Sequence, residues 1–225
     1  MNPILLLHGA LGSLSQLEPL KKQVETNRTP VFTMNFSGHS GRPYSPDGFG
    51  IEVFAHDVLH FLNEHKIEQV DIFGYSMGGY VALWLAHLHP TRIGKIITLG
   101  SKFDWSPESA EKEIKKMNAE KIEEKIPAFA RLLQHRHAPN DWKELLQKTA
   151  NMMYGLGQKP LLTETVYKSI QHPTAILLGD QDDMADRGYS QQVAGLLPKG
   201  MFHLLSNTSH PIEKVDLNLI LDYLK

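Results

Sequence analysis

The 225-residue sequence predicts an α/β fold: a doubly wound, mostly parallel sheet with an inserted helical lid. Short apolar runs alternate with segments of helical periodicity along most of the chain, and the helical segments are long enough to be crossovers. One long charged stretch interrupts this alternation. Because parallel strands require crossover connections, the order favours a sheet covered by helices on both faces.

The apolar runs predict six strands. Ile4–His8 comes first, and its Ile-Leu-Leu-Leu core is typical of a strand buried on both faces. The others are expected at Pro30–Phe36, Gln69–Phe73, Lys95–Leu99, Thr174–Leu178 and Met201–Leu205. The run Ala-Ile-Leu-Leu inside Thr174–Leu178 is continuously apolar in the same way.

Helical periodicity predicts the elements that connect these strands. A Gly/Pro-rich loop leads into an amphipathic helix, Ile51–His65, and Pro90 closes the helix Met77–Leu88. The remaining helices are expected at about Leu14–Thr26, Tyr189–Leu197 and Ile212–Leu224.

From about Lys102 to Ile170 the sequence is charged and favours helices, without a convincing strand. We expect three or four helices here, forming a lid over residues 102–170, while residues 1–101 and 171–225 form the core. The alternative is an ordinary layer of helices beside the sheet, although connections of this length between two strands are rare.

Composition excludes several classes of protein. The net charge of −2 offers no electrostatic basis for binding nucleic acid or an anionic membrane. Cysteine is absent, which excludes disulfides and thiolate nucleophiles and suits a cytoplasmic location. We expect no signal peptide, no membrane span and no metal site; His135 and His137 are interpreted as surface residues rather than metal ligands.

The segment Gly74-Tyr75-Ser76-Met77-Gly78 carries the strongest chemical signal. It matches G-x-S-x-G between a predicted strand and a predicted helix, the context in which this pattern forms a nucleophile elbow. The sharp reversal puts the serine in an unfavourable φ/ψ region, and a Cβ at either glycine would collide with neighbouring backbone. The hydroxyl of Ser76 is thereby raised above the sheet at a helix N-terminus.

A serine nucleophile needs a base, and the base needs an acid to hold its tautomer. Such groups lie in loops at the carboxyl ends of strands. Asp182 lies in the loop after the fifth predicted strand and is the favoured acid, with Asp180 or Asp183 as alternatives and Asp104 as a weaker one.

His210 is the predicted base. It follows the last predicted strand in a polar loop, which completes the chain order Ser…Asp…His. His8 also follows a strand, but it opens His-Gly-Ala-Leu-Gly and has a different role. The tetrahedral intermediate of acyl transfer needs N–H donors. We assign these to the backbone amides of Ala10, after the first strand, and Met77, after the nucleophile.

These motifs resemble the α/β-hydrolase superfamily over nearly the whole chain. Five segments carry the resemblance: His8-Gly9-Ala10, Asn35-Phe36-Ser37-Gly38-His39-Ser40, the elbow around Ser76, the Asp182 loop and Ser209-His210-Pro211. It implies a Ser76, His210 and Asp182 triad without a cofactor, in a compact version that starts on the strand before His8. One departure is Asn35, near which members often have an Asp.

The resemblance implies a carboxylesterase-like serine hydrolase acting on a small or medium ester or thioester through an acyl-enzyme on Ser76. There are three alternatives: a carbon–carbon bond hydrolase, a lyase similar to the pyruvate-eliminating enzyme of the menaquinone pathway, and a non-catalytic small-ligand receptor. The lyase needs a lid cation, for which Arg131, Arg136 and Lys102 are available. We expect a monomer or small homo-oligomer.

The predicted lid must select the substrate. Candidate pocket residues are its large apolar side chains, although apolar residues at helical spacing usually pack against one another. These candidates are Phe103, Trp105, Phe129, Trp142 and Met153, with Met152 and Tyr154 beside the last of them.

Overall fold

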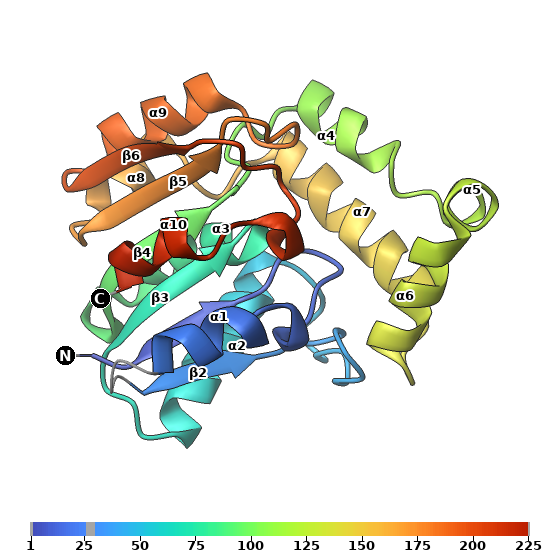
Figure 1. Ribbon diagram of the computed structural model, residues 1–225, viewed down its shortest axis with the longest axis horizontal. Coiled ribbons are helices and arrows are strands. Elements are labelled where there is room, and N and C mark those ends of the chain that lie inside the picture. The colour runs from blue at the N-terminus through green and yellow to red at the C-terminus, as the bar shows by residue number, and fades with distance from the viewer. Residues whose placement is uncertain (1, 26–29, 225) are drawn as a thin grey trace.

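A parallel sheet of six strands forms the centre of the molecule in the computed structural model, which describes residues 2–25 and 30–224 (Figure 1). The strand order is β2-β1-β3-β4-β5-β6, with every neighbouring pair parallel. The strands are β1 Ile4–Leu7, β2 Val31–Met34, β3 Val70–Tyr75, β4 Ile93–Leu99, β5 Thr174–Gly179 and β6 Gly200–Leu205. The predicted fold class is confirmed, with strand ends that differ by one or two residues.

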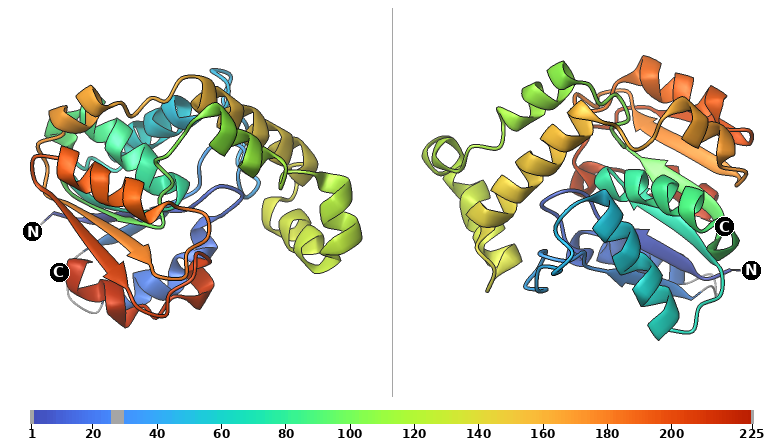
Figure 2. Two further views of the ribbon diagram at one scale, coloured as in Figure 1. Left: turned by 90° about the horizontal axis from the view of Figure 1, so that it is seen from above. Right: turned by 180° about the vertical axis from the view of Figure 1, so that it is seen from behind.

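Helices cover both faces of this sheet (Figures 1 and 2). On one face the apolar core is built on α2 (Ile51–Glu64), α3 (Met77–Leu88) and α9 (Arg187–Leu196). On the other it is built on α1 (Glu18–Glu25) and the C-terminal α10 (Asn218–Leu221). Because both faces are buried, the central strands β1 and β3 have no exposed residue, which explains the continuously apolar sequence of β1.

The order of the strands reverses direction at β1. From β1 the chain moves outward to β2, then returns to place β3 on the opposite side of β1, where Leu7 is in register with Gly74. In open α/β sheets a ligand site lies outside the carboxyl ends of the strands at such a switch point. The loops that follow β1 and β3 therefore mark the expected place for a site.

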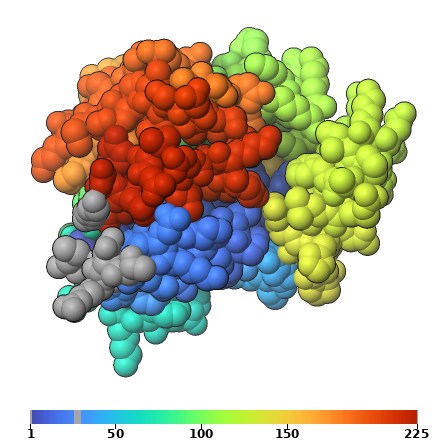
Figure 3. Space-filling view, viewed as in Figure 1, coloured from blue at the N-terminus to red at the C-terminus, as the bar shows by residue number. Residues whose placement is uncertain are grey.

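The stretch between β4 and β5 is described completely and contains five helices, rather than the three or four expected. We call residues 102–170, which contain α4 to α8, the helical segment. Its helices α4 to α7 project to one side of the sheet in Figures 1 and 2, and α5 and α6 form the yellow-green lobe of Figure 3, whereas α8 packs against α3 and α9. Its helices are α4 Pro107–Ile114, α5 Ala119–Lys125, α6 Pro127–His137, α7 Trp142–Gln158 and α8 Glu164–Ser169. The additional break has a local cause, because Ile126 ends α5 and Pro127 occupies the first position of α6.

The predicted C-terminal helix over Ile212–Leu224 is wrong in detail. The chain instead forms a 3₁₀ turn at Ile212–Lys214, the short α10, and a second 3₁₀ turn at Asp222–Leu224. The carboxylate of Asp216 accepts hydrogen bonds from the backbone and side-chain amides of Asn218 (3.0 and 2.9 Å), which interrupts one helix and starts the next. At the other end of the chain, the predicted helix end at Thr26 lies outside the described residues.

Candidate active site

The predicted elbow is present at the end of β3. Ser76 links β3 directly to α3 and has φ 51° and ψ −116°, in the left-handed half of φ/ψ space. Its backbone is held on both sides, because its N–H donates to the Leu99 carbonyl (2.8 Å) and its carbonyl accepts from the Ser101 hydroxyl (2.8 Å). A strained conformation of this kind persists only when the surrounding structure fixes it.

Glycines flank Ser76 because no other side chain fits. A Cβ on Gly74 would lie 2.4 Å from the Gly79 nitrogen, and a Cβ on Gly78 would lie 2.5 Å from the Leu7 carbonyl oxygen. Both contacts are with backbone, which cannot move aside as a flexible side chain can. The steric reason inferred from the sequence is therefore visible in the packing of β1, β3 and α3.

A buried, hydrogen-bonded pair of His210 and Asp182 lies beside the elbow. His210 Nδ1 is 2.8 Å from Asp182 Oδ2, and the other oxygen of Asp182 accepts from the backbone amides of Met184 (2.9 Å) and Ala185 (3.0 Å). Burial alone would raise the pKa of Asp182, but the hydrogen bond and charge of His210 and the two amides lower it. An ionised carboxylate only accepts hydrogen bonds, so Nδ1 carries the proton and Nε2 is left as an acceptor.

The other acids named from the sequence have different partners. Asp180 accepts from the Thr208 amide (3.1 Å) and so ties its loop to the His210 loop. Asp104 pairs with Lys102 (2.8 Å), and Asp183 is exposed. Asp182 is thus the predicted acid that the structure brings into contact with His210.

Tyr75 is a site residue that the sequence reasoning missed. Its hydroxyl donates to the carbonyl of His210 (3.1 Å), and the two rings lie 5.5 Å apart. Burial raises the pKa of Tyr75 above its ordinary value, so the phenol stays protonated and remains a donor. The variable position before the elbow serine therefore fixes the backbone that carries the predicted base. The G-x-S-x-G pattern allows any residue at this position, so the sequence pattern could not predict the contact between Tyr75 and His210.

The loop after β1 approaches the elbow closely. A Cβ on Gly9 would lie 3.0 Å from the Tyr75 ring and 3.1 Å from the Ser76 Cβ. Ala10 follows, and Ala10 and Met77 border the same cavity as Ser76 and His210. Leu11, the next residue, has φ 55°. The loop thus places Ala10, and the start of α3 places Met77, at the cavity that Ser76 borders.

Two side chains from α6 hold this loop. The Leu11 carbonyl accepts from Arg136 Nη1 and His137 Nε2, both at 3.0 Å, and His137 Nδ1 accepts from the Ser40 amide (3.1 Å). Interpreting His137 as a surface residue was wrong, because its side chain is fully buried. Burial lowers its pKa to about 4, so the imidazole is neutral at pH 7. Its neighbour His135 is exposed, as expected.

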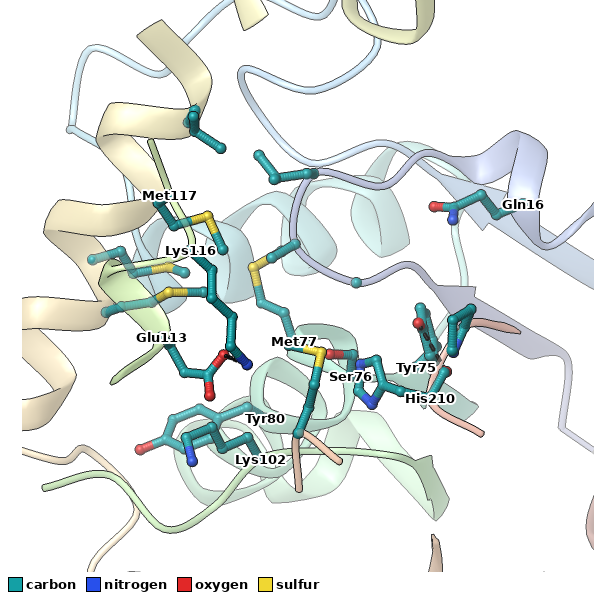
Figure 4. A pocket seen from close by; sticks show the side chains of 18 of the residues that line it. Gln16, Tyr75, Ser76, Met77, Tyr80, Lys102, Glu113, Lys116, Met117 and His210 are labelled. Atoms are coloured by element: carbon teal, nitrogen blue, oxygen red, sulfur yellow. Dashed lines mark hydrogen bonds and ion pairs between the residues drawn. The ribbon is translucent and has the colours of Figure 1, made fainter. Parts of the chain in front are cut away.

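A cavity of about 810 Å³ joins these groups to the helical segment. Figure 4 shows Ser76, Tyr75 and His210 gathered at one side of it, with Glu113, Lys116 and Met117 of the helical segment at the other. Most of the lining is apolar, and it includes five methionines: Met77, Met117, Met152, Met153 and Met184. Flexible thioether side chains adapt to ligands of different shape.

The predicted pocket residues divide into two groups. Trp105, Phe129 and Met153 border the cavity, as does Met152. Phe103 is buried against Tyr80 and Tyr167, and Trp142 is buried in the packing of α5, α6 and α7. Tyr154 is 59% exposed. Of the three cations named for a lyase, Arg131 is exposed, whereas Lys102 and Arg136 border the cavity with the partners given above.

No group of three or more His, Asp or Glu side chains in the described part of the chain is arranged to hold a metal ion. Over the same residues, no helix combines the length and apolar character needed to cross a membrane.

Comparison with known proteins is consistent with this geometry. The family model described as alpha/beta hydrolase fold matches residues 2–152. A probable alcohol acetyltransferase of Cyberlindnera fabianii is 36% identical over 98 residues, which are 42% of this chain and 26% of that protein. The chain thus matches about a quarter of the length of such relatives.

Solved structures resemble the chain over nearly its whole length. NosK from Streptomyces actuosus superposes with a TM-score of 0.84 at 17% identity, covering 100% of this chain and 96% of NosK. A structure from work on carboxylesterases of Nitrososphaera gargenis gives a TM-score of 0.78 at 15% identity, covering 99% and 89% of the two chains. At these identities the likeness concerns the fold.

Proposed function

The chain belongs to the alpha/beta hydrolase family, and from this membership and the site geometry we propose that it is a serine hydrolase. Its substrate would be a small or medium carboxylic ester or thioester, cleaved through an acyl-enzyme on Ser76. The single observation that carries the proposal is the Asp182–His210 pair at 2.8 Å beside a serine in an elbow at a helix N-terminus.

Acylation follows from the protonation states. His210 Nε2 takes the proton of the Ser76 hydroxyl as its oxygen attacks the ester carbonyl, while Asp182 stabilises the imidazolium that forms. The carbonyl oxygen becomes an oxyanion, which the N–H groups of Ala10 and Met77 stabilise. When the intermediate collapses, His210 returns the proton to the departing alcohol or thiol, and the acyl group stays on Ser76.

Deacylation repeats these steps with water. His210 takes one proton from a water molecule, whose oxygen attacks the acyl-enzyme carbonyl, and the same two N–H groups meet the second oxyanion. The proton then passes to the Ser76 oxygen as the acyl bond breaks, releasing a carboxylic acid and the free enzyme.

We assign the role of a lid to the helical segment, residues 102–170, and that of the catalytic core to residues 1–101 and 171–225. Trp105, Phe129 and Met153 of the helical segment border the cavity, so they would contact the substrate chain. The apolar lining favours an acyl or alkyl chain over a charged substrate.

Transfer of the acyl group to an alcohol is a second candidate. The similarity to a protein named as a probable alcohol acetyltransferase motivates it, together with an apolar lining in which an alcohol can compete with water for the acyl-enzyme. Addition of ethanol to a reaction with an acetyl ester tests it. Ethyl acetate formation at the expense of acetate would support transfer, and acetate alone would exclude it.

Initial rates on 4-nitrophenyl esters from acetate to octanoate test hydrolysis, with wild type compared with Ser76→Ala. We expect turnover by wild type and a loss of at least about 10³-fold in kcat for the variant. A wild type that cleaves none of these esters, or a variant that cleaves them equally well, would overturn the proposal.

A further inference from the structure

An ion pair with a buried carboxylate lies on the cavity wall opposite the predicted nucleophile. Glu113, in the last turn of α4, and Lys116, two residues beyond the end of that helix, have carboxylate and ammonium groups 2.8 Å apart, and both residues border the cavity (Figure 4). The Glu113 side chain is 1% exposed, whereas that of Lys116 is 44% exposed. The carboxylate at the cavity wall is therefore almost completely covered, whereas the ammonium beside it is partly open.

The position of Glu113 on its helix is unusual for a carboxylate. The face of α4 turned toward α7 contains buried Ala110, and the next residue along this face beyond the helix, Met117, borders the cavity. Position 113 lies between these two residues on the same face, so helical periodicity favours an apolar residue there. An ion pair that buries a carboxylate is weak evidence for a contribution to stability, so the presence of Glu113 at this position calls for another explanation.

The pair leaves hydrogen-bonding capacity unused. A carboxylate offers about four acceptor sites and an ammonium three donors, and Lys116 is the partner of the Glu113 carboxylate among the described residues. A substrate carboxylate would be repelled by Glu113, and a substrate ammonium by Lys116. A hydroxyl group matches both at once, because it donates to the carboxylate and accepts from the ammonium.

We propose that Glu113 and Lys116 together bind a hydroxyl group carried by the substrate at a distance from the ester bond, and thereby select hydroxylated esters over purely alkyl ones. The inference rests on the proposed hydrolase function and deepens it by naming the substrate class. The hydroxyl belongs to the acyl chain or to the alcohol, depending on which one occupies the helical segment's side of the cavity.

Two substrate series separate these sources. One compares 4-nitrophenyl esters of ω-hydroxy acids with alkanoyl esters in which a methyl group replaces the hydroxyl. The other compares acetate monoesters of diols with acetates of alkanols, at matched lengths. In one series wild type should prefer the hydroxyl member by at least about tenfold in kcat/KM, since hydrogen bonds to charged groups are strong. Ratios within about twofold of one in both series would overturn the proposal.

A double variant, Glu113→Leu with Lys116→Met, should reduce the preference to one or reverse it. The matched control is Glu111→Leu with Lys115→Met, which removes an exposed ion pair (2.9 Å) between α4 and the residue that follows it and should keep the wild-type ratio. An unchanged ratio in the first double variant would contradict the assignment. If that variant does not fold, inhibition of wild type by alkanediols and alkanols decides: diols should inhibit more strongly, and equal inhibition would overturn it.

Failure of this inference is distinguishable from failure of the proposed function. A wild type that cleaves esters with no hydroxyl preference overturns the inference alone. A wild type that cleaves no ester in either series, and whose Ser76 does not react with a fluorophosphonate, overturns both.

Discussion

His137 Nε2 donates a hydrogen bond over 3.0 Å to the carbonyl of Leu11, a residue 126 positions earlier in the chain. The Ser40 amide donates to the other ring nitrogen, which fixes the tautomer in which Nε2 is the donor. Leu11 follows Ala10 and has a positive φ. One imidazole thus connects α6 of the helical segment to the loop that carries a predicted oxyanion donor.

Replacing His137 should destabilise the protein through this connection. His137→Leu leaves the Ser40 amide without its acceptor and removes one of the two donors to Leu11. We expect a loss of about 2–3 kcal/mol in the free energy of unfolding, measured by chemical denaturation. His135→Leu, at an exposed position on the same helix, is the control and should stay within about 0.5 kcal/mol of wild type. Equal stability of the two variants would contradict a structural role for His137.

Stability should also fall on acidification. Burial lowers the pKa of His8 and of His137 to about 4, and that of His39 well below its ordinary value. In the unfolded chain these groups titrate near 6.5, so between about pH 6.5 and 4 the unfolded state binds more protons. The free energy of unfolding must therefore decrease as pH falls through this window.

Denaturation measured at several pH values checks this prediction. The His137→Leu variant should show a shallower dependence than wild type, because one buried imidazole no longer contributes. A wild type whose stability is flat or increases from pH 6.5 to 4 would contradict the neutral state assigned to these three side chains.

Gly78 should not tolerate a methyl group. A Cβ there would lie 2.5 Å from the Leu7 carbonyl oxygen, so Gly78→Ala must displace β1 or α3. We expect at least about 3 kcal/mol of destabilisation. Gly155→Ala is the control: a Cβ at this exposed position in α7 meets no atom within 4 Å and should stabilise the helix by about 0.5–1 kcal/mol. The melting temperatures should move in opposite directions, and a common direction would contradict the steric account.

Asp182→Asn should reduce turnover without unfolding the chain. An amide can donate to His210 Nδ1, which favours the tautomer with its proton on Nε2 and removes the proton acceptor for Ser76. Changes of this kind cost about 10³- to 10⁴-fold in kcat. Asp183→Asn, at the exposed neighbour, should leave kcat within about twofold. A comparable loss in both variants would contradict the assignment of Asp182 as the acid.

The sequence was sufficient for the sheet and for the elbow because both depend on local signals. Apolar runs mark buried strands, and the glycines around Ser76 report a backbone contact that any Cβ would prevent. The choice between Asp180, Asp182 and Asp183 needed three dimensions, since it depends on which carboxylate the loop turns toward His210.

Other site features depend on contacts between distant parts of the chain. His137 seemed a surface residue because its partners Leu11 and Ser40 lie 126 and 97 positions away. The buried position of Glu113 was hidden in a run of charges that resembles a solvated helix face. The break in the final helix was local, but the Asp216 turn that causes it competes with a helical periodicity that continues to Leu224.

Intact mass after incubation with a fluorophosphonate tests the central claim most directly. We expect one covalent adduct on wild type, with no adduct on Ser76→Ala or His210→Ala, because phosphonylation requires a serine that its base has activated. An adduct that persists in Ser76→Ala, or a wild type that forms none while remaining folded, would contradict the assignment of Ser76 as the nucleophile.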